Sequence, residues 1–583
     1  MDQGIPSILS QTLSSLSPRE ALQLAAALLA ALGTLLLLRH RPRRDRLLAR
    51  WDTLTRHWVP VAALALILPL ALRLALLPFC PPPEPVYHDE FTHLLVGDTL
   101  AAGRLANPPH PLRAHFETIY VLQQPTYSAA YPIGQGLFLA AGELLFGHPW
   151  AGVLLSVALM SAAIVWMLYA LLPPGWAAAA GFTAAFHFGA AHLWIDSYWG
   201  GAVGALGGAL VFGALGRLRH GPSPRLALLL GAGWSLVWLV RPFESVWLLL
   251  AASAVLVAFI WRDRPFWRTW IASVTLFLAP LAFTALLSLS HNHAVTGSPL
   301  TLPYQLLQRH YGVPQGLAWQ QVIPQPPLQT PEQETMYLWQ VDAKNAAIQQ
   351  PGTHFQNILK RIQGFYLPYW WLLPFAVAFA LPGDPAARFA TAIPVLALLA
   401  ALLYPFFFPH YIAACACLFI FLIFQGFAVV SRWSWRGWPA GAAFAVFLAT
   451  AGLLPTLRWI PINDLAALRP DPPTRRLRSQ VASHLLAESG RHVVVIRYDP
   501  THPVTDEWLY NAANIDEAPI VWCRPAGPDG FAELRRYYPD RRFWFVDIGA
   551  RCARLAPLSS DDPASVVEFL APASPAKSIV HIQ

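Results

Sequence analysis

The sequence predicts a polytopic α-helical membrane protein of about 12 transmembrane helices followed by a small C-terminal α/β domain. Of the 583 residues, 55% are hydrophobic and only 12% are charged, about half the ~25% charged residues of an ordinary soluble domain. The mean hydropathy is +0.42. These values exclude a mainly water-soluble enzyme, and the 24 Trp exclude a disordered chain, because so much aromatic surface must be buried.

Apolar runs define the membrane segments, since a hydrocarbon core of ~30 Å requires about 20 apolar residues per helix. The clearest runs are residues 21–38, 58–79, 150–172, 176–195, 198–217, 243–261, 269–289, 389–404, 410–430 and 438–458. Three shorter candidates are 133–147, 226–240 and 366–382. Arginines follow the first run directly, without a small-residue cleavage site, so we interpret it as a membrane helix and not as a cleaved signal peptide.

Arginine-rich loops between these runs predict the orientation, because cytoplasmic loops are enriched in Lys and Arg. Four segments of this kind are predicted to be cytoplasmic, namely 39–56, 217–225, 262–268 and 432–436. The long loops 80–132 and 290–365 and the tail from residue 459 are then on the outer side.

This orientation leaves one run too many between residues 80 and 217. If every apolar run in that interval crossed the membrane, Arg217 would lie outside, against its basic character. One run must therefore be re-entrant or interfacial. Our candidate is 133–147, which is short and contains Glu143.

Three parts of the chain follow. Residues 1–57 are an N-terminal transmembrane helix and a basic cytoplasmic loop, residues 58–458 are the main transmembrane domain, and residues 459–583 are an extracytoplasmic α/β domain. The last part has an amphipathic stretch and three strand-like runs, which predict a parallel sheet of about three strands. These segments are 475–489, 492–498, 519–523 and 542–548.

The C-terminal domain is interpreted as an accessory domain, because its sequence has no glycine-rich phosphate loop and no nucleophile motif. It contains two cysteines, Cys523 and Cys552. In an extracytoplasmic domain these two are candidates for a disulfide.

Two adjacent carboxylates, Asp89 and Glu90, begin the first outer loop at the mouth of a membrane helix. In a purely structural interpretation, Asp89 caps a helix over 91–102 and Glu90 lies in its first turn. In a catalytic one, a carboxylate takes the proton of an attacking hydroxyl. The same loop offers polar and aromatic side chains suited to a polyol acceptor, and these are His88, His93, Asn107, His110, Arg113, His115, Glu117, Tyr120, Gln123, Gln124, Tyr127 and Tyr131.

Three stretches resemble a known family: HDEFTHLLVGDTLAAGRL from residue 88, YPIGQGLFLAAGELLFG from residue 131 and PHYIAACACLFIF from residue 409. They resemble the GT-C membrane glycosyltransferases of family 39 and related enzymes, which include protein O-mannosyltransferases, the lipid A aminoarabinose transferase and the RgtA-B-C-D-like superfamily. The resemblance covers about residues 58–460 and rests mainly on the acidic pair. Two positions depart from the family pattern, since Tyr131-Pro132-Ile133 replaces Lys-Pro-Pro and His410-Tyr411 replaces Arg-Tyr or Lys-Tyr.

The resemblance implies a GT-C-like fold and inverting transfer of a sugar from a polyprenyl-phosphate donor to a hydroxyl on the outer face. It also implies that Asp89 is the general base and that Glu90 tunes it or touches the acceptor.

A lipid phosphate is a good leaving group that needs cationic or hydrogen-bonding groups as charge builds on its oxygens. Arg241, His410 and Tyr411 are the main candidates, with Arg309 behind them. The three main candidates also have simpler structural roles. Arg241 is three residues from Glu244 and suits a salt bridge, and His410 and Tyr411 suit an aromatic belt.

The predicted partners are a polyprenyl-phosphate sugar lipid, membrane lipids and an unknown hydroxyl acceptor. Nucleic acid is not expected despite a pI of 9.3, because the arginines lie in short loops. No cofactor is expected, although His88, Asp89 and His93 offer ligands for a divalent cation. The expected location is the inner membrane, with multiple passes. A transporter or lipid flippase and a catalytically silent scaffold are the alternatives, and the absence of internal symmetry favours the enzyme.

Overall fold

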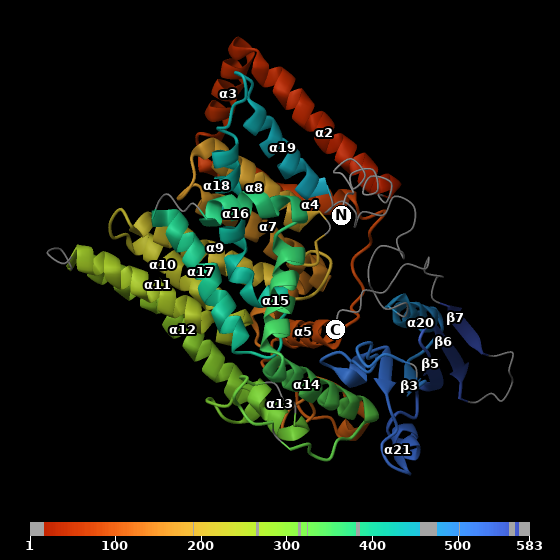
Figure 1. The fold of residues 1–583 in the computed structure, drawn as a ribbon. Helices are drawn as coiled ribbons and strands as arrows, with labels where there is room; N and C mark the ends of the chain where they lie inside the picture. The colour runs from red at the N-terminus through yellow and green to blue at the C-terminus, as the bar shows by residue number, and fades with distance from the viewer. Residues whose placement is uncertain are drawn as a thin grey trace.

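The computed structural model shows a large helical bundle with a small α/β domain at one end (Figure 1), so the predicted fold class is confirmed. It describes residues 17–190, 192–263, 268–312, 316–322, 324–380, 385–454, 475–500, 502–558 and 566–570. Seven described helices are long and apolar enough to cross a membrane. They are α2 (Pro18–Arg39), α4 (Trp58–Ala75), α7 (Pro149–Leu168), α9 (Gly201–Leu218), α11 (Pro242–Arg262), α12 (Ile271–Thr296) and α18 (Ala416–Val430), the last continuing the 3-10 helix η4 (Pro409–Cys415).

The remaining predicted apolar runs also form helices, most of them shorter. They are α6 (Gly134–Phe146), α8 (Pro174–Gly189), α10 (Pro224–Val240), α16 (Leu372–Ala380), α17 (Pro385–Leu402) and α19 (Ala440–Leu453). One prediction was wrong, because the basic segment after α2 is not a loop but the helix α3 (Arg41–Thr55). Beyond Pro42 in its first turn, that segment has no helix breaker and is rich in Arg and Leu, which favour the helix.

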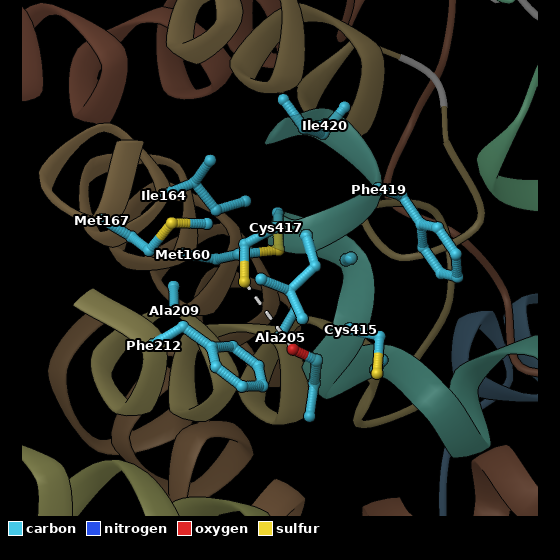
Figure 2. Close-up of a cluster of buried hydrophobic side chains, with 14 of the residues drawn as sticks. Met160, Ile164, Met167, Ala205, Ala209, Phe212, Cys415, Cys417, Phe419 and Ile420 are labelled. Carbon is cyan, nitrogen blue, oxygen red and sulfur yellow. Dashed lines mark hydrogen bonds between the residues drawn. The ribbon is translucent and has the colours of Figure 1, made fainter. Parts of the chain in front are cut away.

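The bundle core is tightly packed around η4 and α18. Figure 2 shows Met160 and Met167 of α7 lying with Ala205 and Ala209 of α9 beside Cys417. The close approach depends on glycine, since a Cβ added at Gly208 would lie 2.0 Å from the carbonyl oxygen of Ala414. Small residues of this kind let membrane helices pack backbone to backbone.

Helix α6 does not traverse the bundle. At its start, the Gln135 amide donates to the carbonyl of Tyr198 (3.0 Å), and just beyond its end the Trp150 indole donates to the carbonyl of Ile195 (2.8 Å). Both ends therefore contact the same turn between α8 and α9. At the far end of α7 the Arg217 guanidinium donates to the carbonyl of Trp166 (2.7 Å), so α7 runs from the α6 end of the bundle to the Arg217 end. This arrangement agrees with the interfacial or re-entrant segment expected at 133–147.

The two long loops are ordered at the same end of the bundle. Loop 1 (80–132) contains α5 (His88–Ala101), the 3-10 helix η1 (Arg113–Phe116) and an antiparallel pair of short strands, β1 (Val121–Leu122) and β2 (Ser128–Ala129). Loop 2 (290–365) contains the end of α12 and the helices α13 (Pro303–Tyr311), α14 (Pro331–Gln349) and most of α15 (Pro351–Tyr366).

The C-terminal domain is a mixed sheet with two helices. Its elements are α20 (Arg475–Ala487), β3 (His492–Tyr498), β4 (Ile520–Cys523), α21 (Gly530–Tyr537), β5 (Arg542–Ile548), β6 (Cys552–Pro557) and β7 (Val567–Leu570). The strand order is β4-β3-β5-β6-β7, with the first three strands parallel and the last two antiparallel. The three predicted parallel strands are present, but β6 and β7 were missed, because only Ala553 and Leu555 of β6 are buried and the apolar alternation is correspondingly weak.

The disulfide considered for this domain does not form. Cys523 and Cys552 are both free thiols, and the buried Cys523 donates to the carbonyl of Val494 (3.6 Å). Three strand spacings of about 4.8 Å separate β4 from β6, whereas a disulfide requires Cα atoms within ~7 Å.

Candidate active site

Helix α5 begins at the acidic pair, and Glu90 is the residue that caps it. The buried Glu90 carboxylate accepts hydrogen bonds from the backbone N–H groups of Val86 (3.0 Å) and Tyr87 (3.3 Å) with one oxygen. With the other oxygen it accepts the N–H of Tyr198 (3.2 Å). The helix starts at His88, and the N-cap is Tyr87, so the capping role expected for Asp89 belongs to Glu90. Glu90 thereby fixes α5 to the turn between α8 and α9.

Asp89 is left with a different environment. Its side chain is half-buried and accepts a hydrogen bond from the Tyr131 hydroxyl. The Tyr131 ring stacks on His93 at 5.0 Å and lies 6.2 Å from the ring of Tyr304. The carboxylate therefore faces an aromatic cluster built from loop 1 and loop 2, with a phenol as its partner.

Arg241 supplies the positive charge beside this carboxylate. It lies at the junction of α10 and α11, where the following Pro242 breaks the helix and holds Arg241 in an extended conformation (φ −142°, ψ 80°). The guanidinium lies 4.4 Å from the ring centre of Tyr411 and interacts electrostatically with Glu244 and, more weakly, with Asp89. Among the ion pairs of the described residues, none joins Arg241 to Glu244, so the salt-bridge alternative is not realised as a direct contact.

Two imidazoles complete the cluster. His93 and His410 are each 6% exposed, and both interact electrostatically with Arg241 and with each other. The His410 ring also contacts Trp199 at 5.0 Å. The Nδ1 atoms of both histidines are buried and have no hydrogen-bond partner within the part of the chain that the structure describes. The site therefore combines one half-buried carboxylate with a guanidinium and two imidazoles, each of which has a ring nitrogen available for a further hydrogen bond.

The structure brings together most of the residues expected from the sequence, which are Asp89, His93, Tyr131, Arg241, His410 and Tyr411. His88 lies behind them, with its ring edge against Tyr120 at 5.3 Å. Arg309 was wrongly placed: it is exposed on α13, and no contact with the cluster occurs among the described residues. Loop 2 instead contributes Tyr304, from the opposite end of that helix.

Some residues of this cluster and its surroundings were missed in the sequence. Tyr304 and Tyr404 each interact electrostatically with a charged residue of the site, Tyr304 with Asp89 and Tyr404 with Arg241. Both lie next to a proline, a signal too common to single them out. Arg73 was missed within the apolar run of α4, although a charge in a membrane segment is itself a reason for attention.

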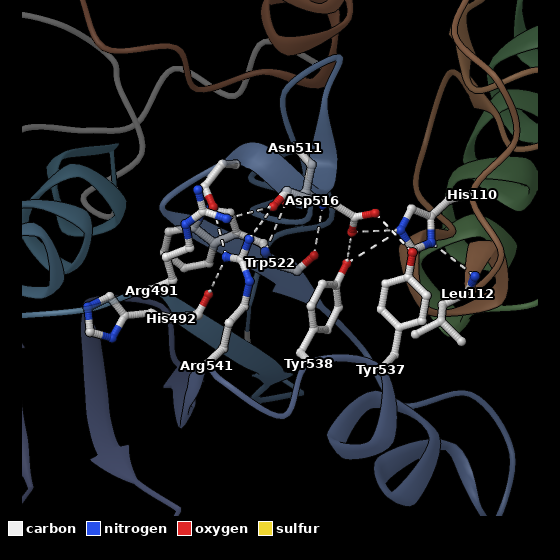
Figure 3. Close-up of polar contacts among 11 residues, drawn as sticks. His110, Leu112, Arg491, His492, Asn511, Asp516, Trp522, Tyr537, Tyr538 and Arg541 are labelled. Atoms are coloured by element: carbon white, nitrogen blue, oxygen red, sulfur yellow. Dashed lines mark hydrogen bonds and ion pairs between the residues drawn. The ribbon is translucent and has the colours of Figure 1, made fainter.

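The C-terminal domain docks beside this site, on loop 1. Figure 3 shows one of the contacts, in which Asp516 meets His110 (3.0 Å) and accepts hydrogen bonds from the hydroxyls of Tyr537 (2.9 Å) and Tyr538 (2.6 Å). A salt bridge of 2.6 Å from Arg524 to Glu332 joins the same domain to loop 2.

A buried acid in this domain makes its stability depend on pH. Burial, assisted by repulsion from Glu507, raises the pKa of Asp506 to about 7. Because the folded pKa lies above the unfolded value of ~3.9, this group's contribution to stability is complete below that value and is lost as the pH rises through about 7. We expect Asp506→Asn to remove this loss, which is worth about 1.4 kcal/mol per pKa unit.

The measurement is the unfolding temperature of both proteins in detergent from pH 4 to pH 8. The unfolding temperature of the variant should rise relative to that of the wild type as the pH increases. A difference between the two unfolding temperatures that stays constant over this range would contradict the buried-acid assignment.

Fold and site together define a polytopic helical membrane protein with a clustered carboxylate, guanidinium and imidazoles where two long loops meet the bundle. No family model and no curated protein matches the chain. Among solved structures, the chain is similar to ArnT from Cupriavidus metallidurans in the apo state, with 13% identity, coverage of 82% of this chain and 92% of that one, and a TM-score of 0.42.

It is also similar to two structures from Archaeoglobus fulgidus. One is the oligosaccharyltransferase in the apo form, with 10% identity and a TM-score of 0.37. The other is the archaeal oligosaccharyltransferase AglB in complex with an inhibitory peptide and a dolichol-phosphate, with 11% identity and a TM-score of 0.38. Each comparison covers 84% of this chain and 69% of the other. These are distant likenesses.

Proposed function

We propose that the protein is an inverting membrane glycosyltransferase, which moves a sugar from a polyprenyl-phosphate donor to a hydroxyl acceptor. The observation that carries this proposal is that one aromatic cluster holds both groups: Asp89 accepts a hydrogen bond from Tyr131, and the Arg241 guanidinium lies over Tyr411. A lipid-linked phosphate has its chain among the membrane helices and its charge at their ends. The reaction therefore requires an anion-binding group and a base at that boundary, and the site offers both.

The chemistry divides between the two halves of the site. Asp89, oriented by the Tyr131 hydroxyl, takes the proton of the acceptor hydroxyl as its oxygen forms a bond to the anomeric carbon. The bond from that carbon to the phosphate oxygen breaks, and its electron pair stays on the phosphate. Arg241, with the imidazoles of His93 and His410, stabilises the negative charge that builds there. Attack opposite the leaving phosphate inverts the anomeric centre.

The proposal includes the orientation of the molecule. The basic α3 and Arg217 lie at one end of the bundle and are assigned to the cytoplasm, in line with the positive-inside rule. Both long loops, the site and the C-terminal domain are then extracytoplasmic, on the outer face of the inner membrane. A lipid donor presented on that face reaches Arg241 laterally from the bilayer, while a polar acceptor reaches Asp89 from the aqueous side.

The test is the lipid that copurifies with the protein, because it does not require the acceptor to be known. We expect a polyprenyl-phosphate sugar in the wild type and at least a tenfold lower amount in Arg241→Ala, since a hydrogen bond to a charged group contributes about 1.5–3 kcal/mol. Mass spectrometry of extracted lipids gives the identity and the amount.

Arg225→Ala is the matched control, because Arg225 is exposed at the start of α10, at the other end of that helix from Arg241. It should retain the donor at the wild-type level. Bulk phospholipid alone in all three preparations would count against the glycosyltransferase and favour a transporter or a scaffold.

A further inference from the structure

Helix α5, which carries Asp89, shares a hydrophobic core with the C-terminal domain. Phe91 and Leu95 belong to one buried cluster with Val481 and Val494 of that domain. The long membrane helices α7, α9 and α18 form a separate cluster. One buried face of α5 therefore packs with the C-terminal domain, although the two are almost 400 residues apart in the chain, while another face packs against α6.

Hydrogen bonds attach the same domain to the other end of α5. The Asp98 carboxylate accepts the backbone N–H of Ala513 at 2.6 Å. Just beyond the helix, the Arg104 guanidinium donates to the side-chain oxygen of Asn514 at 2.5 Å. The domain thus contacts α5 from its first turn to past its last.

Phe91 is the main contact in the first turn. The Tyr510 ring stacks on it face to face, with centroids 4.6 Å apart and planes 6° from parallel. The Arg478 guanidinium lies 4.9 Å from the centre of the same Phe91 ring. Arg478 is itself immobilised, since it donates to the backbone carbonyls of Trp508 (3.1 Å) and Tyr510 (2.9 Å).

This contact restrains the first turn from a different side than the bundle contact of Glu90 with Tyr198, so the two together orient it. Residues two apart in a helix do not share a face, so Phe91 is held on a side of α5 different from the one that presents Asp89. The first turn of a helix also lacks part of its own hydrogen bonding, so contacts from outside decide its position. A shift of about 1 Å in a reacting group can cost ~10²-fold in rate.

We infer that the C-terminal domain is a positioning element for the proposed catalytic base, acting through Tyr510 and Arg478 on Phe91. The role assigned to Asp89 rests on the proposed function, whereas the restraint on α5 does not. Neither Tyr510 nor Arg478 takes part in the chemistry. The domain interpreted from sequence as accessory is in this view required for full turnover.

The experiment compares Tyr510→Leu with Tyr510→Phe in the full-length protein in detergent. Leucine removes the stacked ring, whereas phenylalanine keeps the ring and loses only the hydroxyl that donates to the Ile119 carbonyl. Hydrogen–deuterium exchange of residues 91–96 is measured first. We expect at least tenfold faster exchange in Tyr510→Leu and wild-type exchange in Tyr510→Phe.

Turnover is then measured as release of the sugar from the donor that copurifies with the wild type, with water in place of the unknown acceptor. Tyr510→Leu should lower kcat at least tenfold. Donor affinity should stay within twofold of the wild type, because Arg241 and His410 lie on other elements. Tyr510→Phe should have the kcat of the wild type. A merely structural defect would change donor affinity as well. Wild-type exchange, or faster exchange with unchanged kcat, would overturn the inference.

Two further results separate the possible failures. If Asp89→Asn keeps full turnover, Asp89 is not the base. The hydrogen–deuterium exchange data still test whether the C-terminal domain restrains α5. If Tyr510→Leu does not accumulate as folded protein, Arg478→Met is used for the same two measurements, since it removes the guanidinium but preserves the length of the side chain.

Discussion

Asp89→Asn is expected to lower sugar transfer by about 10²–10⁴-fold, the range that general-base catalysis contributes. Asparagine has the same shape and still offers an oxygen to the Tyr131 hydroxyl, so the site should retain its geometry. What it cannot do is take the proton of the acceptor. The measurement is turnover of the purified variant with the copurified donor lipid.

Glu90→Gln is the informative comparison, because the neighbouring carboxylate has a different task. Glu90 accepts three backbone N–H groups with its two oxygens, and a glutamine side chain has only one oxygen to offer. We therefore expect Glu90→Gln to lower the unfolding temperature, whereas Asp89→Asn should keep the wild-type unfolding temperature and donor content. Undiminished turnover in Asp89→Asn would show that Asp89 is not the general base.

The second large effect concerns Arg73, whose side chain is completely buried in α4. Its guanidinium lies 2.9 Å from the carboxylate of Asp196 and donates to the carbonyls of Cys80 (2.5 Å) and Pro81 (3.0 Å). Arg73→Met leaves the Asp196 charge without this partner inside the bundle. Breaking a buried ion pair from one side costs about 3–5 kcal/mol, so a large drop in the unfolding temperature is expected.

The double variant Arg73→Met/Asp196→Asn provides the control. It removes both charges, so it should be more stable than Arg73→Met alone, because the cost of the single variant comes largely from the orphaned carboxylate. Unfolding in detergent can be followed by tryptophan fluorescence. A wild-type unfolding temperature for Arg73→Met, or a double variant less stable than the single one, would contradict this account.

Turnover of Arg73→Met should fall as well. Cys80 and Pro81 begin the loop that leads to Asp89, and Arg73 fixes that beginning against Asp196. The pair of Arg73 and Asp196 could not be identified from the sequence, because the two residues are 123 positions apart.

Local composition determined much of this protein. The length and position of an apolar run can be read from the sequence alone, and within the described residues each predicted run contains a helix. The acidic pair, Arg241 before its proline, and His410-Tyr411 were also recognisable, because charged and polar groups beside membrane segments are rare and costly. Counting basic loops also led to the prediction that the segment 133–147 is interfacial or re-entrant.

Contacts between distant residues decided the rest. Asp89 and Glu90 are adjacent and chemically alike, and the folded structure separates their roles. Glu90 caps α5 and also accepts the N–H of Tyr198 from a distant turn, whereas Asp89 faces Tyr131. The stacking of Tyr510 on Phe91 likewise joins two ends of the chain. The sequence by itself determined which segments are helices and which groups are candidates for chemistry, since these depend on neighbours in the chain. Tertiary packing alone decided which groups meet, since that depends on how helices and loops far apart in sequence fold together.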